Sequence, residues 1–249
     1  MEYLEFFRQR ATLRSFSSTR HISDEQLNQL LAAASHAPTT GNMQLYSVVV
    51  TRSAEGKKRL APCHFNQASV EGCDALLTFC ADFRRFEAWC EARGARPGYD
   101  NFHSFVTALI DTTIFAQQFV TLAELNGIGS CYLGTATYSA ESIAEILELP
   151  KRVVPVITLA AGYPADEFPK PSDRLPIEGI IHHERYSDYT RDDIDRIYAA
   201  KESLPENAGF VAENQTPSLA HIFTDIRYPR SLNEEISRTF GDFIKKQGY

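Results

Sequence analysis

Arg10, Thr12 and Arg14 alternate with small or apolar residues in the stretch RATLRSF (residues 10–16). In an extended backbone alternate side chains share one face, so two guanidinium groups and a hydroxyl would point the same way. Guanidinium groups bind phosphate through charge-assisted, often bidentate hydrogen bonds. The stretch is therefore a candidate phosphate clamp, although the pattern taken alone fits a solvated edge strand with surface arginines somewhat better.

A second cluster of hydrogen-bonding groups lies in the stretch APTTGNMQLY (residues 37–46), between two apolar regions. Thr39, Thr40 and Asn42 offer donors and acceptors, and Gly41 allows close approach of the backbone. A plain turn needs two or three such residues. The cluster therefore predicts a loop that holds a ligand.

A third small-residue stretch, GIGSCYLG (residues 127–134), is faintly similar to a dinucleotide-binding fingerprint. Tyr132 stands where the third glycine is required, and the stretch follows an expected helix where the fingerprint follows a strand. A Rossmann site is therefore rejected. We expect a strand edge at which small residues let a flat ligand approach the backbone.

Other chemistries find little support. His182, His183 and Glu184 are adjacent, but neighbouring strand residues point to opposite faces, so no metal site is expected. Asp82 and Asp111 are interpreted as cap or interface residues. The five cysteines form no CxxC pair, which is typical of free thiols in a reducing compartment.

These residues need elements to position them. Apolar β-branched runs predict strands, and 3.6-residue periodicity predicts helices. Strands are expected at 46–51, 75–82, 130–134 and 152–164, and helices after Ser23, at 103–126, after Ser139, after Thr190 and from Ser231 to about Lys246. Strands alternating with helices indicate an α+β domain, which we divide into a core (1–186) and a helical C-terminal extension (187–249). Residues 202–220 are expected to form a polar loop.

The helix expected at 103–126 is apolar on most of its circumference, which is typical of a helix buried in a core or a subunit interface. Ala108, Ile110, Phe115 and Phe119 are not expected to face one core together. A homodimer is therefore predicted. Residues 84–101 contain arginines and aromatic residues and are a candidate flap over the site. The aromatic residues Phe65, Phe83, Phe86, Trp89 and Phe102 are interpreted individually as core rather than as a pocket wall.

Composition narrows the class of protein. The 249 residues are 43% hydrophobic and carry a net charge of −7, which argues against a sequence-independent nucleic-acid binder. The beginning of the sequence lacks the pattern of a signal peptide, and no run of about 18 apolar residues predicts a membrane span. A cytoplasmic protein is expected.

In this order, the motifs resemble those of the FMN-dependent nitroreductase and flavin reductase superfamily, and most of all its larger oxygen-insensitive nitroreductases. The matching segments are 10–14, 38–44, 127–134, 149–150, 162–164, 174–186 and 243–249. The resemblance implies a nitroreductase-like fold, with a central mixed β-sheet flanked by helices and FMN bound at the interface of a homodimer. Two positions depart from the pattern: Ala11 replaces a polar residue, and Ser172 replaces a lysine for which the nearby Lys170 is a candidate substitute.

The resemblance also assigns roles to residues. The implied FMN-binding residues are Arg10, Thr12, Arg14, Pro38, Thr39, Thr40, Asn42, Gln67, Leu133, Gly134 and Arg174. Arg10, Thr12 and Arg174 match phosphate or ribityl contacts, and Arg14 matches a residue at the pyrimidine edge of the flavin. Leu133 and Gly134 match backbone contacts near flavin N5. No protein side chain is expected to be the catalytic group.

The implied function is reduction of nitroaromatics, quinones or flavins by NAD(P)H, through ping-pong hydride transfer. Reduction of another acceptor, such as an enone, an azo compound or a specialised metabolite, and a non-enzymatic flavin-binding module stay open. Strict use of NADPH is not expected, because residues 202–220 hold Glu202, Glu206 and Glu213 and no Lys or Arg. Such a loop repels a phosphate dianion, although Lys201, Arg227 or Arg230 could still reach it.

Overall fold

The computed structural model describes residues 3–249, which form two compact units. Unit 1 comprises the chain up to Lys170 together with Ile236–Tyr249, and unit 2 comprises Pro171–Glu235. The boundary thus lies before residue 186, and the chain returns to unit 1 near its end. Both points differ from the division expected from the sequence.

Unit 1 contains the sheet. Its strands are β1 (Tyr46–Thr51), β2 (Ala75–Asp82), β3 (Gly129–Leu133) and β4 (Val153–Gly162). Its helices are α1 (Tyr3–Arg8), α2 (Asp24–Ala34), α3 (Ala54–Leu60), α4 (Ala68–Gly72), α5 (Arg84–Glu91), α6 (Phe102–Leu125) and α7 (Ala140–Ile146), with short 3₁₀ turns η1 (Thr40–Asn42), η2 (Ala61–His64) and η3 (Gly134–Ala136). The expected strands and the long helix are confirmed.

The sheet has the order β1-β2-β4-β3, and every pairing within the described residues is antiparallel. The expectation of a mixed sheet is therefore wrong for this chain. The pairs β1–β2 and β3–β4 form the two sides, and β2–β4 joins them at the centre with a register shift at Phe79/Cys80. Long-range pairing of residues 75–82 with 153–162 thus forms the middle of the fold.

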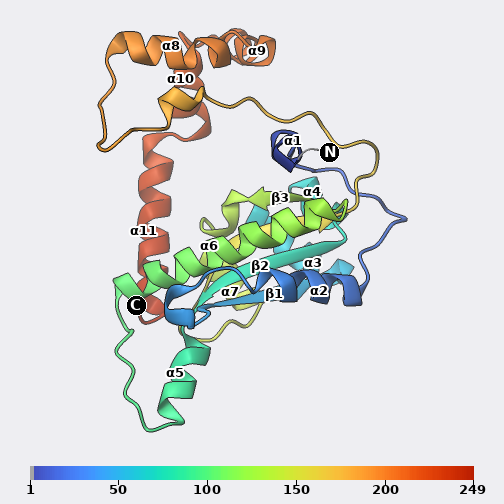
Figure 1. Ribbon diagram of the computed structural model, residues 1–249, viewed down its shortest axis with the longest axis vertical. Helices are drawn as coiled ribbons and strands as arrows, with labels where there is room; N and C mark the ends of the chain where they lie inside the picture. Colours follow the sequence, from blue (N-terminus) through green and yellow to red (C-terminus); the bar gives the residue numbers. More distant parts are fainter. Residues whose placement is uncertain (1–2) are drawn as a thin grey trace. The chain divides into compact units, whose positions relative to one another are not determined.

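Both faces of the sheet are covered, which explains why all eight residues of β2 are buried. Leu77 and Phe79 point to the face covered by α2 and α6. Leu76, the residue before Leu77 in the pleat, points to the other face, where α3, α4 and α7 pack. Figure 1 shows α6 crossing one face with α2 nearby, and α3 and α7 behind the sheet. A strand covered on both sides has a nearly continuous apolar sequence, and residues 75–81 are apolar except for Thr78.

Helix starts follow the expected caps in two cases. The Ser23 side chain accepts a hydrogen bond from the backbone N–H of Gln26 at the start of α2. Thr190 and Asp193 form a reciprocal capping box at the start of α8 (Arg191–Glu202). Ser139 precedes α7, but its side chain makes no capping hydrogen bond. The sequence signals therefore place helix starts better than they predict cap geometry.

Helix α6 is the core helix of unit 1. Ala108, Phe115 and Phe119 are buried but Ile110 is not, so the expectation that these four residues do not all face one core is confirmed. Ile110 is 52% exposed, and Phe102 and Ile114 are exposed beside it along the helix. The helix is long and apolar enough to pass as a membrane span by composition. Its buried contacts with the sheet and its buried Asp111 are typical of the core helix of a folded domain instead.

Unit 2 is helical. It contains the turn η4 (Ile177–Gly179), α8, α9 (Pro205–Glu213), α10 (Leu219–His221), the π-helical turn η5 (Ile222–Arg227) and the first residues of α11 (Arg230–Lys246). The expectation of a loop at 202–220 is therefore wrong, because residues 205–213 form α9. Pro205 stands at the first turn of that helix, where its missing N–H costs nothing. The expected last helix is confirmed as α11.

Arg152 ties three segments of unit 1 together. Its side chain is 9% exposed and pairs with Glu87 of α5. The guanidinium also donates to the backbone carbonyls of Tyr99 and Gly248 and lies 4.3 Å from the centre of the Tyr249 ring. Arg152 thus joins α5, the segment before α6 and the residues after α11.

This arrangement predicts a large loss of stability for Arg152→Met. Methionine keeps the apolar stem but leaves the mostly buried Glu87 carboxylate without its cation and two carbonyls without donors. We expect the free energy of unfolding to fall by about 3 kcal/mol, measured by urea unfolding. Arg191→Met is the matched control, since Arg191 is 93% exposed and pairs with Asp195 at 3.9 Å; it should change stability by less than about 0.5 kcal/mol. Equal losses in the two variants would contradict this role of Arg152.

Candidate functional site

Residues 10–16 run extended beside β3, as expected. The Leu13 N–H donates to the Ser130 carbonyl at 3.0 Å, and Phe16 forms an isolated antiparallel bridge with Pro164. A Cβ atom on Gly129 would come within 2.5 Å of the Leu13 side chain, so this close approach requires glycine. The contact fixes the segment against the end of the sheet.

The alternation of side chains is confirmed for residues 10–14, but it ends at Ser15, which is exposed. Ala11 and Leu13 are buried, whereas Arg10 and Thr12 are partly exposed and Arg14 is exposed. Arg10, Thr12 and Arg14 therefore lie on the side of the segment that faces away from the core. This is the geometry that a phosphate clamp requires, and it remains a prediction that they bind one.

Glu124 of α6 is a partner of Arg10 that the sequence reasoning missed. Its Oε1 lies 3.2 Å from Arg10 Nε, and its side chain is only 9% exposed. Burial raises the pKa of the Glu124 carboxyl, and the Arg10 charge partly offsets that shift. A lone acidic residue in the last turn of an apolar helix is the signal that could have pointed to this pair.

The positive charges of Arg10 and Arg14 also affect the titration of neighbouring residues of β3. Burial raises the pKa of the Cys131 thiol, and the nearby guanidiniums of Arg14 and Arg10 lower it in part. Burial likewise raises the pKa of Tyr132 to about 12, and its hydroxyl donates to Gln117 Oε1 at 3.2 Å. At both residues burial therefore outweighs the effect of the nearby positive charges.

The loop at residues 39–42 is shaped by one buried carboxylate. Asp111 of α6 is 1% exposed and accepts hydrogen bonds from the backbone N–H (2.9 Å) and hydroxyl (3.1 Å) of Thr40. Its second oxygen lies 3.4 Å from the Leu45 backbone nitrogen. Asp111 thus caps the loop, which agrees with its interpretation as a cap residue.

The backbone of this loop is unusual. Gly41, Asn42 and Gln44 all have positive φ angles near 55°, a region that non-glycine residues seldom adopt. The Thr39 hydroxyl lies 3.4 Å from the Gln44 backbone nitrogen, and the Asn42 side chain lies 3.4 Å from that of Gln44. Because the Thr40 hydroxyl donates to Asp111, only its lone pairs remain for a ligand. Pro38 and Asn42 are exposed.

Gln67, Leu133 and Gly134 lie at the ends of other elements. Gln67 precedes α4 as its N-cap residue and is partly buried. Leu133 is buried at the end of β3. Gly134 follows it, and a Cβ atom there would meet no atom within 4 Å. The space that a side chain at Gly134 would occupy is therefore open.

A groove lies beside the 39–42 loop. It has a volume of about 610 Å³ and is lined by Gly41, Asn42, Met43, Arg85, Phe86 and Trp89. Trp89 is 57% exposed, whereas Phe83 is buried in the core. Arg85 donates to the Tyr46 carbonyl at 3.1 Å and also to that of Gln44. Helix α5 thus forms one wall of the groove, and the candidate residue Asn42 lies on another.

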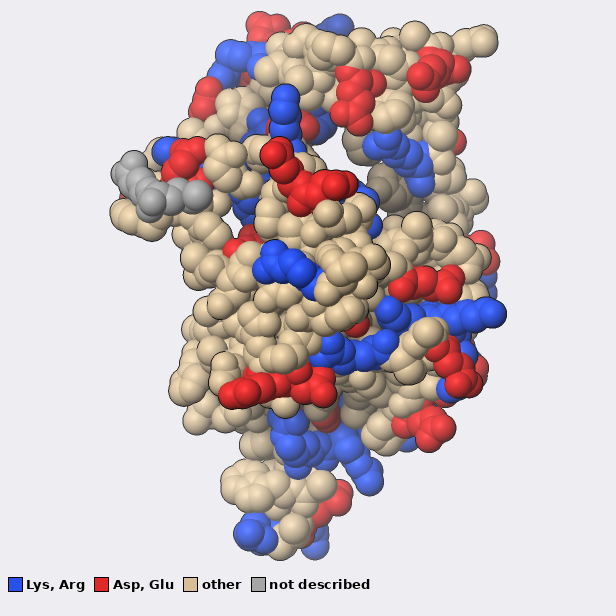
Figure 2. Space-filling model, turned by 90° about the vertical axis from the view of Figure 1, so that its right-hand side faces the viewer, with Lys and Arg blue, Asp and Glu red and all other residues tan. Residues whose placement is uncertain are grey.

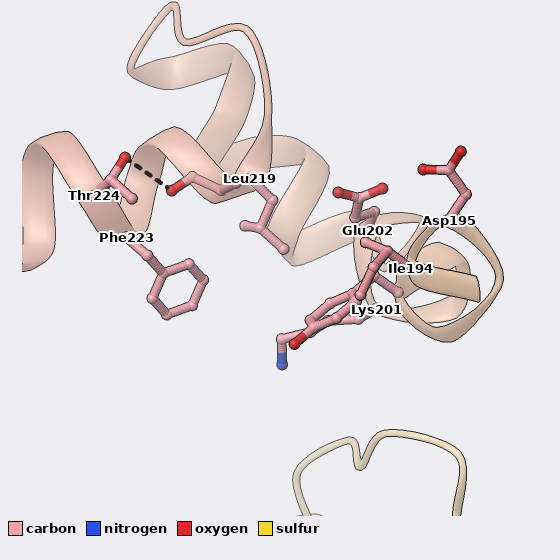
Figure 3. Close-up of a pocket in the computed structure, with 9 residues that line it drawn as sticks. Ile194, Asp195, Lys201, Glu202, Leu219, Phe223 and Thr224 are labelled. Atoms are coloured by element: carbon pink, nitrogen blue, oxygen red, sulfur yellow. Dashed lines mark hydrogen bonds between the residues drawn. The ribbon is translucent and has the colours of Figure 1, made fainter. Parts of the chain in front are cut away.

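Arg174 belongs to unit 2, where it is exposed and donates to the carbonyls of Ser172 and Asp173. Unit 2 also contains a cavity of about 470 Å³, lined by residues of α8, α10 and η5. Figure 3 shows Lys201 and Phe223 directed toward this hollow, with Glu202 and Asp195 nearby on α8. None of the candidate FMN residues lines this cavity.

The described residues contain no group of metal-ligating side chains, and the face drawn in Figure 2 shows no uniformly basic patch. Across residues 3–249 no three His, Cys, Asp or Glu side chains are grouped as metal ligands would be. In the face drawn in Figure 2, basic and acidic side chains are interspersed among neutral ones. The candidate site therefore rests on the clamp, the 39–42 loop and the ends of β3 and η2.

Comparison with known proteins gives one family. Residues 7–163 match the Nitroreductase family. The FMN reductase (NADPH) of Bacillus subtilis is 31% identical over 183 residues, which are 73% of each chain. The crystal structure of a Bacteroides fragilis protein described as an oxidoreductase is 51% identical, covers 98% of both chains and superposes with a TM-score of 0.96.

A structure determined with FMN is also similar. It is described as a nitroreductase from Exiguobacterium sibiricum, is 28% identical, covers 74% of this chain and 98% of its own, and has a TM-score of 0.62. The resemblance inferred from the motifs is thereby confirmed, and so is the α+β fold. The chain belongs to the nitroreductase family.

Proposed function

We propose that this protein is an FMN-dependent oxidoreductase that takes electrons from NAD(P)H and passes them to flat, electron-poor acceptors such as nitroaromatics, quinones or flavins. The observation that carries the proposal is the clamp of Arg10, Thr12 and Arg14 on the exposed side of a segment fixed against β3. Family membership supports the same reaction class. We also propose a ping-pong kinetic mechanism, in which the oxidised nicotinamide leaves before the acceptor binds. The proposed location is the cytoplasm.

The residues present fit FMN. Arg10 and Thr12 offer a guanidinium and a hydroxyl for the phosphate and ribityl chain, and a Cβ atom at Gly134 would meet no atom within 4 Å, which leaves space there for a flat ring. Bound FMN supplies the two-electron chemistry between donor and acceptor. The protein's part is to bind and orient: Arg10 and Thr12 at the phosphate and ribityl chain, Arg14 as positive charge at the pyrimidine edge.

A homodimer is proposed because the candidate residues fall into two groups in one chain. Arg10 is held at Glu124, and the 39–42 loop is held at Asp111, 13 residues earlier on α6. At 1.5 Å per residue these positions are about 20 Å apart along the helix. Two-fold pairing of chains brings the loop of one protomer toward the clamp of its partner. Both groups then contribute to each site.

The exposed stripe of α6 is the surface proposed for this pairing. Phe102, Ile110 and Ile114 are 65%, 52% and 38% exposed, and successive members lie eight and four residues apart on one side of the helix. Apolar side chains in such a row are costly to leave in water. Covering them by a second copy removes that cost.

Use of both NADH and NADPH is proposed. The basic residues near α9 already have partners: Lys201 pairs with Asp173 at 2.9 Å, Arg227 lies over the Phe210 ring and Arg230 pairs with Glu234. Helix α9 itself carries Glu206 and Glu213 and no basic residue. This segment gives a 2′-phosphate no free cation, so it provides no reason for strict NADPH use.

Reduction of another acceptor by the same cofactor, such as an enone, an azo compound or a specialised metabolite, is a second candidate function. The groove beside α5 favours an aromatic acceptor, because Trp89 and Phe86 line it. A flavin-binding module without turnover is the non-enzymatic alternative. The rate at which NAD(P)H bleaches bound flavin distinguishes that module from an enzyme.

The absorbance spectrum of the purified protein tests the function directly. We expect a yellow protein with bound FMN, whose visible band is lost rapidly when NADH is added without air and returns when a quinone is added. Bleaching over many minutes would favour the binding module. A colourless protein that does not quench the fluorescence of added FMN would exclude the proposed function.

Replacement of Arg10 tests the clamp. Because loss of Arg10 alone would leave Glu124 as a mostly buried charge without its partner, the variant is Arg10→Met combined with Glu124→Gln. A charged hydrogen bond contributes about 1.5–3 kcal/mol, so the Kd for FMN should rise about 10- to 150-fold while that for riboflavin stays unchanged. Arg8→Met, at a position 68% exposed, is the control. Equal losses for FMN and riboflavin would show that Arg10 does not contact the phosphate.

Replacement of Ile110 tests the dimer. Ile110→Asp places a charge in the α6 stripe, where pairing would bury it at a cost of several kcal/mol. Sedimentation should show the wild type at twice 28.0 kDa and the variant as a monomer with weakened FMN binding. Val50→Asp, at another exposed apolar position, should stay dimeric. A wild-type monomer that retains FMN would contradict the shared site.

A further inference from the structure

His64 is a buried histidine that the redox chemistry does not use. It is the last residue of η2, and its side chain is removed from solvent. Its Nδ1 lies 2.8 Å from the hydroxyl oxygen of Thr135, which is also buried, and the two residues are 71 positions apart in the sequence. Within residues 3–249 no polar group meets the other ring nitrogen, Nε2. Within the described residues, the contact with Thr135 is therefore the only hydrogen bond of the His64 ring.

The two partners stand beside two candidate flavin residues. Thr135 follows Gly134 directly, in the turn η3. His64 precedes Gln67 by three residues, and its carbonyl accepts the Gln67 backbone N–H at 3.2 Å. A change in the position of His64 is thus passed to Gln67 through one hydrogen bond, and a change in Thr135 is passed to Gly134 through one peptide.

The backbone between His64 and Gln67 is held in an unusual shape. Phe65 and Asn66 both have left-handed φ angles, 56° and 51°, which cost free energy unless the surroundings hold them. The N–H groups of Phe65 and Asn66 donate to the carbonyls of Pro62 and Ala61. The segment is therefore a fixed turn that presents Gln67.

A second contact joins the same two segments nearer the surface. The rings of Phe65 and Tyr138 lie 6.3 Å apart, and the Tyr138 N–H donates to the Thr135 carbonyl at 3.1 Å. The inner polar contact and the outer aromatic contact together fix the spacing between η2 and η3. Of the two contacts, only the inner one is a hydrogen bond, whose strength depends on the alignment of donor and acceptor.

The state of the imidazole suits a positioning role. Burial lowers the pKa of His64 to about 4, so the ring is neutral at ordinary pH. A neutral ring that is sealed from solvent and bonded to a hydroxyl does not exchange protons with a substrate. His64 is therefore no general acid or base.

We propose that His64 is a positioning residue: its hydrogen bond to Thr135 sets the separation of Gln67 and Gly134, and with it the fit of the isoalloxazine ring between them. This inference rests on the proposed FMN function. It assigns the bond to recognition of the ring, whereas Arg10 and Thr12 recognise the phosphate side of the cofactor.

The experiment measures the Kd of FMN and of riboflavin by fluorescence quenching, and the visible circular dichroism of the bound flavin. Thr135→Val and His64→Leu remove the bond. Thr135→Ser keeps the hydroxyl, and His64→Asn places an amide group where Nδ1 stands. Thr78→Val is the matched control, since Thr78 is also buried but its hydroxyl has no partner within the described residues.

We expect Thr135→Val and His64→Leu each to raise the Kd of both flavins about 10-fold and to alter the circular dichroism of bound flavin. The double variant should bind each flavin with about the same Kd as the weaker-binding single variant, because both changes remove the same interaction. Thr135→Ser, His64→Asn and Thr78→Val should stay within about 3-fold of the wild type. Rescue by the conservative variants separates a directed bond from general packing.

Wild-type affinity and circular dichroism in Thr135→Val would overturn the inference while leaving the proposed function intact. A loss confined to FMN, or independent additive losses in the two single variants, would overturn it too. A wild type that binds neither flavin would instead contradict the proposed function, and the inference with it. His64→Leu failing to fold leaves the test standing, because Thr135→Val and Thr135→Ser carry it alone.

Discussion

A buried carboxylate must find donors, and that requirement at Asp111 organises one end of unit 1. Asp111 lies in the apolar helix α6 with 1% exposure, where an unpaired charge would cost several kcal/mol. The N–H and hydroxyl of Thr40 supply the donors. The loop that carries Thr39, Gly41 and Asn42 is thereby attached to the long core helix α6. A binding loop gains precision when its backbone is fixed by a helix behind it.

Near the other end of α6 a second carboxylate, that of Glu124, holds another polar segment. Arg10 lies in a segment outside the sheet, and Glu124 of α6 supplies the anion beside it. Helix α6 therefore holds the 39–42 loop through Asp111, which accepts hydrogen bonds from Thr40. It holds the segment at residues 10–14 through Glu124, which pairs with the Arg10 guanidinium. The segments between these anchors are fixed by close packing, as between Gly129 and Leu13.

Much of this fold could be predicted from local patterns. The apolar runs at 46–51 and 75–82 are strands, and Ser23 and Thr190 cap helices, because those signals act within a few residues. The antiparallel order of the sheet could not be predicted, since it depends on pairing of residues 75–82 with 153–162. Helix α9 was missed because its polar, glycine-containing sequence has weak periodicity. The exposed side of residues 10–14 followed from alternation, whereas the partners Glu124, Asp111 and Thr135 lie too far away in the sequence for any spacing rule.

Unit 1 is discontinuous in the chain, and this has a consequence for the order of folding. Phe243 and Ile244 fill part of its core together with Phe83, Phe105 and Val154, yet residues 171–235 of unit 2 separate them from the rest of that core. A ribosome releases the chain from its N-terminus at about 5–20 residues per second. The sheet can therefore pair before α11 exists, and one apolar flank stays open until unit 2 has been made. During synthesis that flank is the natural place for a chaperone to bind.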